Sequence, residues 1–124
     1  MRLLLDTNVL IWWLAESPRL SAETREAITG ELEVMVSAVS AFEIAAKAAA
    51  GKLRVPGDLA VQITEQTMIE LPVTVRHGLA VGQLPMHHRD PFDRLLIAQA
   101  GCEGLTIVTS DRVFAAYDVP TLPA

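Results

Sequence analysis

Apolar segments of strand length alternate with helix-forming segments along this chain, and this alternation constrains the fold more than any other feature. Runs rich in leucine, valine and isoleucine indicate strands at residues 2–5, 34–36, 68–71, 105–108 and 119–122. Amphipathic or alanine-rich segments between them indicate helices. Strands that alternate with helices form a parallel sheet covered on both faces. The sequence therefore predicts a three-layer α/β/α sandwich with a central, mostly parallel sheet of four to five strands.

Capping residues predict where the helices begin and end. Thr7 and Asn8 offer cap chemistry for a first helix, and Ser40 precedes an alanine-rich helix that runs to about Ala50. Pro91 is well placed as the first residue of a later helix, because its missing N–H needs no partner there. Further helices are expected at about residues 21–30, 58–66 and 74–84.

Length and composition indicate one soluble unit. The 124 residues contain no internal repeat and no linker-like stretch, so we expect a single domain over residues 1–124. No apolar run approaches the ~18 residues of a membrane span, and Asp6 interrupts the first one too early for a signal peptide. We therefore expect a cytoplasmic protein without a membrane contact. The single cysteine, Cys102, lies among small apolar residues and is typical of a packed thiol.

The net charge of −5 argues against a broad basic surface, which usually supplies most of the nonspecific affinity for nucleic acid. The objection weakens where several of the acids are clustered around a cation. A bound metal ion reverses the local sign of the charge and attracts a phosphate group.

Four acidic residues, Asp6, Glu43, Asp93 and Asp111, lie next to apolar structure. Asp6 follows the first strand and Asp111 follows the strand at 105–108, so both fall at the carboxyl edge of the sheet, where ligands bind. Any one of them alone is typical of a helix terminus or a solvated carboxylate. Carboxylates that converge in one cleft repel each other, and a hard divalent cation stabilises them. The four together therefore indicate a metal centre.

Oxygen ligands favour Mg²⁺ or Mn²⁺, and the chain lacks the Cys and His spacing of a zinc site. A divalent ion held by carboxylates suits phosphodiester hydrolysis without a side-chain nucleophile. Asp6 and Asp93 are the expected direct ligands. Glu43 binds the metal or positions water, and Asp111 binds through water or completes a second site. The polar neighbours expected to orient these acids or to contact phosphate are Asn8, Thr109 and Ser110.

Four motifs follow one another along nearly the whole chain. They are LLLDTN at residues 3–8, SAFEI at 40–44 with Lys47 and GKL at 51–53, HRDPFDRLLIAQA at 88–100, and TSD at 109–111. In this order and separation they resemble the PIN-domain family, and specifically its VapC-type toxins. Phe42 stands where many relatives of this subgroup have Trp, an apolar exchange that leaves the neighbouring acid unchanged.

This resemblance implies a magnesium- or manganese-dependent endoribonuclease, frequent homodimers, and a cognate antitoxin that blocks the site. Carried over by position, Asp6 and Asp93 are metal ligands, with Glu43 and Asp111 as the remaining acids. The family suggests, and the electrostatics favour, an antitoxin arginine that reaches the acidic cluster. We therefore expect RNA as the substrate and a VapB-like antitoxin as the partner.

Several further residues have two readings. Asp90 is either the N-cap beside Pro91 or an outer contributor to the acidic site. His87 and His88 fall in a predicted loop, where a solvated side chain is commoner than a catalytic base. Basic residues that are candidates for phosphate contacts are Lys47, Lys52, Arg54, Arg89, Arg94 and Arg112. For Arg94, a structural ion pair is an equal alternative. The adjacent Trp12 and Trp13 diverge by ~100° on a helix, so one can face the core but hardly both, and a partner or dimer surface is an equal alternative.

Other functions fit the sequence less well. A phosphatase with an aspartate nucleophile after the first strand needs a second acid two residues on, where this chain has Asn8. A receiver domain needs an acidic pair near the first strand, which is absent from the sequence. Cleavage of DNA by the same metal site stays open. A noncatalytic PIN-fold binding module is the alternative from a different class, and it predicts that neutralising Asp6 or Asp93 leaves the cellular effect unchanged.

Overall fold

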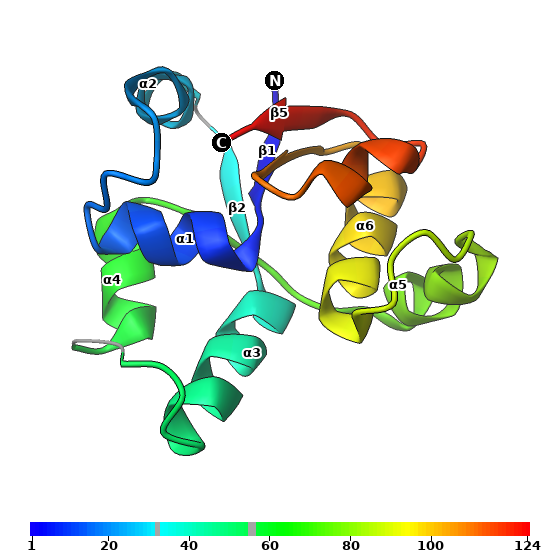
Figure 1. Ribbon diagram of the computed structural model, residues 1–124, viewed down its shortest axis with the longest axis horizontal. Helices are drawn as coiled ribbons and strands as arrows, with labels where there is room; N and C mark the ends of the chain where they lie inside the picture. The colour runs from blue at the N-terminus through cyan, green and yellow to red at the C-terminus, as the bar shows by residue number, and fades with distance from the viewer. Residues whose placement is uncertain (32, 55–56) are drawn as a thin grey trace.

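The first apolar run of the sequence forms the central strand of the fold. In the computed structural model, which describes residues 1–31, 33–54 and 57–124, all of β1 (Leu3–Leu5) is fully buried. β1 pairs in parallel with β2 (Val34–Ser37) on one side and with β4 (Thr106–Thr109) on the other. β3 (Ile69–Leu71) and β5 (Thr121–Pro123) complete a sheet of order β3-β2-β1-β4-β5, again with parallel pairing (Figure 1).

Helices cover both faces of this sheet. They are α1 (Thr7–Leu14), α2 (Ala22–Gly30), α3 (Ala38–Ala49), α4 (Leu59–Glu65), α5 (Val75–Ala80) and α6 (Pro91–Glu103), with the short 3₁₀ helices η1 (Val81–Gln83) and η2 (Arg112–Ala116). The predicted α/β sandwich is therefore confirmed, with a wholly parallel sheet among the described residues. Within the described ranges, every helix is too short or too polar to cross a bilayer.

The alternation of side chains along β1 divides the apolar core in two. Leu3 and Leu5 pack with side chains of α1, α2 and α4, whereas Leu4 packs with side chains of α6 and η2. Figure 1 shows α1, α2 and α4 on one side of the sheet and α6 on the other. Because both faces of β1 are buried, its sequence is continuously apolar instead of alternating.

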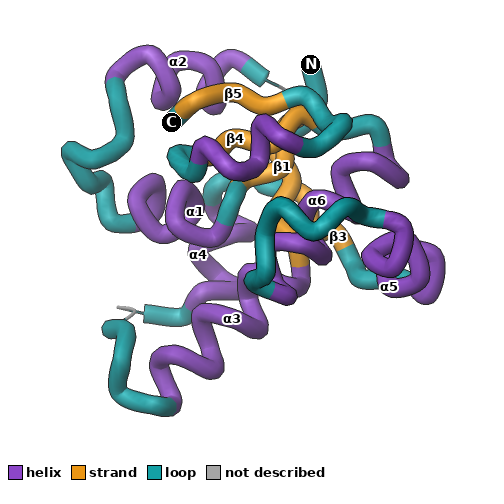
Figure 2. Tube along the Cα trace, turned by 45° about the vertical axis from the view of Figure 1, so that its right-hand side comes forward, coloured by secondary structure: helices purple, strands orange, loops and turns teal. Residues whose placement is uncertain are grey.

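The carboxyl ends of β1, β2 and β4 lie at one edge of the sheet, and α1, α3 and η2 begin directly after them. α3 follows β2 directly, and Figure 2 shows it projecting beyond the sheet. The polar residues that follow these strands are therefore brought together at this edge, as the topology predicts.

Two helices begin earlier than expected. α1 begins at Thr7 with Asp6 in the N-cap position, although the Asp6 side chain makes no capping hydrogen bond. α3 begins at Ala38, because Ser37, which ends β2, accepts a hydrogen bond from the Val39 N–H at 3.0 Å. Ser40 is therefore not the cap. It lies inside α3, where its Oγ is hydrogen-bonded to Thr7 Oγ1 at 2.9 Å.

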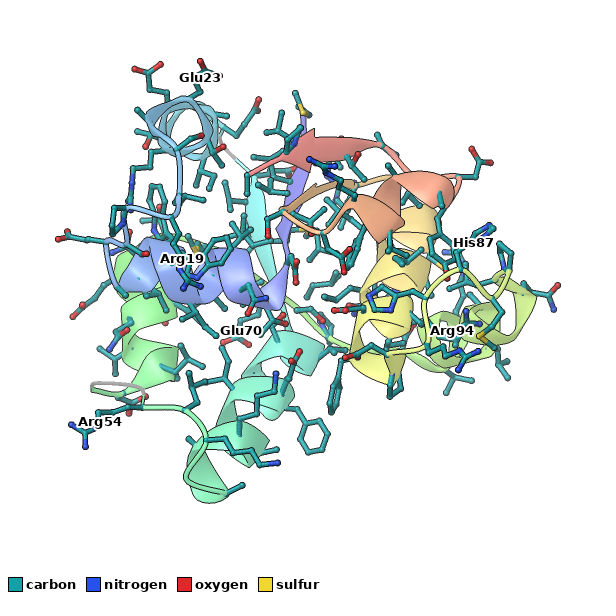
Figure 3. All side chains as sticks on the ribbon, in the orientation of Figure 1. Arg19, Glu23, Arg54, Glu70, His87 and Arg94 are labelled. Carbon is teal, nitrogen blue, oxygen red and sulfur yellow. The ribbon has the colours of Figure 1, made fainter. Side chains whose placement is uncertain are left out.

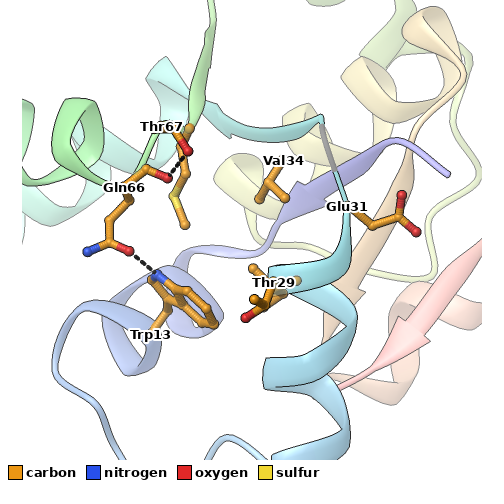
Figure 4. A pocket seen from close by; sticks show the side chains of 8 residues that line it. Trp13, Thr29, Glu31, Val34, Gln66 and Thr67 are labelled. Carbon is orange, nitrogen blue, oxygen red and sulfur yellow. Dashed lines mark hydrogen bonds between the residues drawn. The ribbon is translucent and has the colours of Figure 1, made fainter.

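The two tryptophans of α1 both pack, partly buried, against the same core cluster, so the expectation that hardly both face the core is wrong. Trp13 Nε1 donates a hydrogen bond to Gln66 Oε1 at 3.1 Å (Figure 4). Arg19 and Arg25 lie over the Trp12 and Trp13 rings at 6.0 and 5.9 Å from their centroids. Arginines thus cover the outer parts of both rings.

Candidate metal centre

Asp6 lies at the carboxyl end of β1 and is buried. Its Oδ2 accepts a hydrogen bond from Thr109 Oγ1 at 2.7 Å, and the same hydroxyl oxygen accepts one from the Asp111 N–H at 3.0 Å. Burial raises the pKa of the Asp6 carboxyl, and the Thr109 hydrogen bond opposes that rise. Thr109, at the end of β4, therefore links Asp6 by hydrogen bonds to the segment that carries Asp111.

Glu43 lies on α3 with only 7% of its surface exposed, as its place beside the buried stripe of this helix predicts. Its Oε2 forms an ion pair with Lys47 Nζ, one helical turn on, at 2.6 Å. Its Oε1 is buried and has no hydrogen-bond partner, the one such side-chain atom among the described residues. An unpaired carboxylate oxygen in a buried place is costly, so this atom is one that a ligand would satisfy.

Asp93 lies in the first turn of α6 and is partly buried. Burial, followed by the charges of Asp6 and Asp90, raises the pKa of its carboxyl to about 7, and Glu43 adds to the rise. His88 acts in the opposite direction. The structure thus brings Asp6, Glu43 and Asp93 close enough to repel one another when they are all ionised.

Asp90 is the N-cap of α6. Its Oδ1 accepts hydrogen bonds from the N–H groups of Phe92 and Asp93 at 2.8 and 3.2 Å. The capping reading is therefore confirmed, and the cap also fixes the backbone of Asp93. Its charge contributes to the raised pKa of Asp93, so Asp90 belongs to the outer part of the acidic centre as well.

For His88, the prediction of a solvated loop side chain is wrong. His88 is partly buried instead of solvated, and its Nε2 lies 2.8 Å from Asp93 Oδ2 and 3.1 Å from Asp111 Oδ2. Asp111 Oδ1 accepts a hydrogen bond from the Val113 N–H at 3.0 Å, which caps η2. Asp111 therefore meets Asp93 through the imidazole. His87 is exposed, as expected, with its ring edge-on to Tyr117 at a centroid distance of 5.2 Å.

Arg94 is only 8% exposed, so its side chain is not available for a phosphate contact with RNA. Its guanidinium donates to the carbonyl oxygens of Val81, Leu84, Pro85 and His88 and to the Tyr117 hydroxyl, at 2.9 to 3.4 Å (Figure 3). Both sequence readings of Arg94 are wrong, since these partners are neutral oxygens. The residue holds segment 81–88 against α6 and so fixes the place of His88.

The other predicted residues lie on the surface. Asn8 and Ser110 are exposed after β1 and β4, and the exposed basic residues are Lys47, Lys52, Arg54, Arg89 and Arg112. Of these, Lys47 is already paired with Glu43.

The donor set fits a hard divalent cation. It consists of carboxylate oxygens, one of which is buried and unpaired, and burial together with the repulsion by neighbouring carboxylates raises the pKa of Asp93 to about 7. A ring nitrogen of His88 and carboxylate oxygens of Asp93 and Asp111 also lie within 4.8 Å of one another. A cation at this edge would relieve the repulsion and satisfy Glu43 Oε1.

Comparison with known proteins agrees with this geometry. The model of the PIN domain family matches residues 3–120. The chain belongs to the PIN-domain family, as its four motifs predict. Its similarity reaches the VapC type, because it is 33% identical to Ribonuclease VapC22 of Mycobacterium tuberculosis over 120 residues, which cover 94% of this chain and 92% of the relative.

Solved structures share the fold. VapBC2 from Rickettsia felis, bound to a DNA fragment from its promoter, gives a TM-score of 0.71 at 14% identity, over 99% of this chain and 98% of the other. DNA-bound VapBC from Salmonella typhimurium gives 0.71 at 20% identity, over 99% and 98%. FitAcB from Neisseria gonorrhoeae gives 0.68 at 21% identity, over 97% and 96%.

Proposed function

We propose that this protein is a divalent-cation-dependent endoribonuclease that acts as the toxin of a toxin–antitoxin pair. The observation that carries the proposal is the unpaired, buried Glu43 Oε1 in a centre where burial and the charges of Asp6 and Asp90 raise the pKa of Asp93 to about 7. Both the unpaired buried oxygen of Glu43 and the raised pKa of Asp93 reflect destabilising interactions, so they serve binding and not the stability of the fold. The ribonuclease name of the VapC22 relative supports RNA as the substrate.

In this proposal Asp6, Glu43 and Asp93 hold Mg²⁺ or Mn²⁺, and Asp111 completes the acidic centre through His88. When bound, the ion supplies Lewis-acid polarisation of a phosphodiester and a nucleophile at neutral pH. Thr109 fixes the orientation of the Asp6 carboxylate through its 2.7 Å hydrogen bond. Lys47 holds Glu43 Oε2, which leaves Oε1 for the ion.

Substrate binding falls to residues around this centre. Lys52, Arg89 and Arg112 are exposed and are proposed as phosphate contacts. Arg94 is omitted, since its donors are already used inside the fold. The negative net charge of −5 does not exclude RNA here, because the loaded centre is itself a positive site.

The proposal includes an antitoxin and a homodimer. The antitoxin rests on the neighbouring VapBC structures, and the acidic centre would attract a cationic side chain from such a partner. The homodimer is supported by apolar side chains left open on α5 and after it, with Val75 80%, Leu79 73% and Met86 70% exposed. Val75 and Leu79 are four residues apart and so lie on one face of α5, and exposed apolar residues that lie together are typical of contact surfaces.

The test is to incubate tag-free, antitoxin-free protein with total cellular RNA and Mg²⁺ or Mn²⁺, with and without EDTA, and to sequence the new RNA ends. Asp93→Asn is the inactive variant. Asp118→Asn is the matched control, because Asp118 is exposed just before β5 and so lies at the opposite, amino edge of the sheet.

Discrete, metal-dependent cuts are expected from the native protein and from Asp118→Asn, and none from Asp93→Asn. Intact RNA from folded protein that binds the ion would contradict the proposal. In that case, cuts in a parallel DNA sample would assign a deoxyribonuclease, and intact DNA would favour the noncatalytic binding module.

A further inference from the structure

One nitrogen atom occupies the space between two of the four acids. His88 Nε2 forms a hydrogen bond with Asp111 Oδ2 at 3.1 Å and lies 2.8 Å from Asp93 Oδ2. The two carboxylates come from different parts of the chain, Asp93 from α6 and Asp111 from the segment after β4. The imidazole is therefore the group that joins them.

The hydrogen bond at the second ring nitrogen, Nδ1, determines whether Nε2 carries a hydrogen. His88 Nδ1 accepts a hydrogen bond from the Asp90 N–H at 3.2 Å, so this nitrogen presents a lone pair and carries no hydrogen. The ring hydrogen is then on Nε2. A nitrogen that carries a hydrogen donates to an oxygen and cannot at the same time bind a metal ion through its lone pair.

The ring is also held in place from outside the acidic centre. It packs edge-on against the buried ring of Phe114 at a centroid distance of 5.8 Å. The backbone carbonyl of His88 accepts from Arg94 at 3.3 Å, and its N–H donates to the Tyr117 hydroxyl at 2.7 Å. The ring contact with Phe114 and the backbone contacts with Arg94 and Tyr117 thus fix the place of Nε2–H.

Two carboxylates of different elements that face one another commonly bridge a second divalent cation, which lies about 3.5–4 Å from the first in two-metal nucleases. Such an ion needs ~2.1 Å to an oxygen of each carboxylate. Here the space between Asp93 Oδ2 and Asp111 Oδ2 already contains a fixed N–H group, at 2.8 and 3.1 Å from these oxygens.

We propose that the Nε2–H group of His88 takes the place of a second divalent cation between Asp93 and Asp111, so that this centre binds one ion per chain. The inference rests on the proposed function, since it concerns the metal centre of that function. His88 is then a positioning residue. It holds Asp111 against Asp93 and leaves Asp6, Glu43 and the remaining oxygen of Asp93 to hold the single ion.

The test counts Mn²⁺ ions on tag-free, metal-free protein in a buffer without nitrogen ligands. Free Mn²⁺ is read from its electron paramagnetic resonance signal during a titration, and nitrogen coordination is read from electron spin echo modulation on the loaded protein. Three variants accompany the native chain. His88→Ala removes the donor, His88→Gln keeps an N–H at a similar reach, and His87→Ala is the control at the exposed neighbouring histidine.

We expect one ion for the native protein, for His88→Gln and for His87→Ala, and a second, weaker ion for His88→Ala. No directly bound nitrogen is expected in the native protein. Two ions on the native protein would overturn the inference while leaving the proposed function intact, as would a nitrogen coupling that disappears in His88→Ala. A count of one for a folded His88→Ala would overturn it too.

No binding of Mn²⁺ by the native protein would instead overturn the proposed metal centre itself. Should His88→Ala fail to fold, as judged by circular dichroism, the native count and the nitrogen coupling decide the question alone. One ion without bound nitrogen supports the inference, and any other combination contradicts it.

Discussion

Helix α6 carries two polar clusters with opposite properties. At its start, Asp93 belongs to an acidic centre in which a buried oxygen of Glu43 has no partner. Six residues later, Gln99 is fully buried. Its Oε1 accepts from Ser37 Oγ at 2.5 Å, and its Nε2 donates to the Pro72 carbonyl at 3.3 Å.

The second cluster continues to α5 with its hydrogen-bonding groups satisfied. His77 Nδ1 accepts from the Thr74 N–H at 3.1 Å and lies 3.4 Å from Gln99 Nε2, while His77 Nε2 lies 3.4 Å from Glu103 Oε1. A fully paired buried network fixes one packing arrangement. The acidic centre instead keeps repulsion and an unpaired atom, which a ligand can relieve. The difference separates a part of the molecule that serves stability from a part that serves binding.

The largest expected effect concerns the acidic centre. Asp93→Asn removes a charged ligand oxygen, and loss of several kcal/mol of transition-state stabilisation corresponds to a fall in kcat/KM of about a thousandfold. The same variant should not lower the melting temperature of the metal-free protein, because it removes the ionisable carboxyl whose pKa is raised to about 7 by burial and by the charges of Asp6 and Asp90. Cleavage assays and thermal unfolding in EDTA check both parts. A large fall in melting temperature would mean that Asp93 is structural.

The second prediction concerns the paired network. Gln99→Leu keeps the volume but leaves the buried Ser37 hydroxyl without its acceptor, at about 1–3 kcal/mol, and removes the donor to the Pro72 carbonyl, which costs less because Pro72 is exposed. We expect a loss of about 3 kcal/mol in the free energy of unfolding and no change in Mn²⁺ affinity. Urea unfolding and the Mn²⁺ titration measure these. Gln83→Leu, at an exposed position of η1, is the control. Weaker Mn²⁺ binding by folded Gln99→Leu would contradict the separation of the two clusters.

The sequence predicts the strands and helices that carry both clusters, because these elements depend on local sequence patterns. The buried run Leu3–Leu5 predicts a central strand, and the pair Asp90 and Pro91 predicts the start of α6. Asp6 and Asp111 follow strands, Asp93 lies in the first turn of α6, and Glu43 lies further along α3, the helix after β2, so topology indicates that the four acids approach one edge of the sheet. Ser37 and Ser40 are equally competent caps, however. The choice of Ser37 follows from β2, which continues to the register pair Ser37 and Leu71.

The predictions for His88 and Arg94 are wrong because the partners of these residues are distant in sequence or belong to the backbone. His88 finds Asp111 23 residues away, and no spacing in the chain indicates that pair. Arg94 finds carbonyl oxygens of segment 81–88, which any sequence would offer. The usable signal for His88 was its position two residues before the cap Asp90, which allows Nδ1 to accept the Asp90 N–H.

A third, smaller effect is the pH dependence of the metal-free protein. The folded pKa of Asp93 is raised to about 7 from 3.8, so the folded state binds more protons than the unfolded state between these values. Its contribution to stability is therefore fully present below pH ~4 and is lost as the pH rises through 7. After allowance for solvent screening of a partly exposed group, the loss amounts to about 1–2 kcal/mol.

This dependence is measured as the difference between native protein and Asp93→Asn in urea unfolding at pH 5, 6, 7 and 8, with EDTA. The native protein should lose stability relative to the variant as the pH rises. Saturating Mg²⁺ should reverse the trend, because the ion favours the ionised carboxylate. A difference that does not change with pH would mean that the carboxyl is not held against its neighbours.

The smallest effect tests the point where the acidic centre touches solvent. Lys47 Nζ lies 2.6 Å from Glu43 Oε2, and this hydrogen bond raises the pKa of Lys47, but the lysine side chain is 49% exposed. The lysine is half exposed but Glu43 is buried, so Lys47→Met leaves a buried carboxylate without its partner and should lower the free energy of unfolding of the metal-free protein by about 1 kcal/mol.

The same substitution removes a positive charge beside the proposed ion and frees the second oxygen of Glu43. Mn²⁺ affinity should therefore rise, by about two- to fivefold for a gain of under 1 kcal/mol. Lys52→Met, at an exposed position after α3, is the control and should leave the affinity unchanged. A fall in Mn²⁺ affinity for Lys47→Met would mean that the lysine orients Glu43 more than it repels the ion. The Lys47–Glu43 ion pair would then favour metal binding by fixing the position of Glu43, as the Gln99 network fixes the packing of the core.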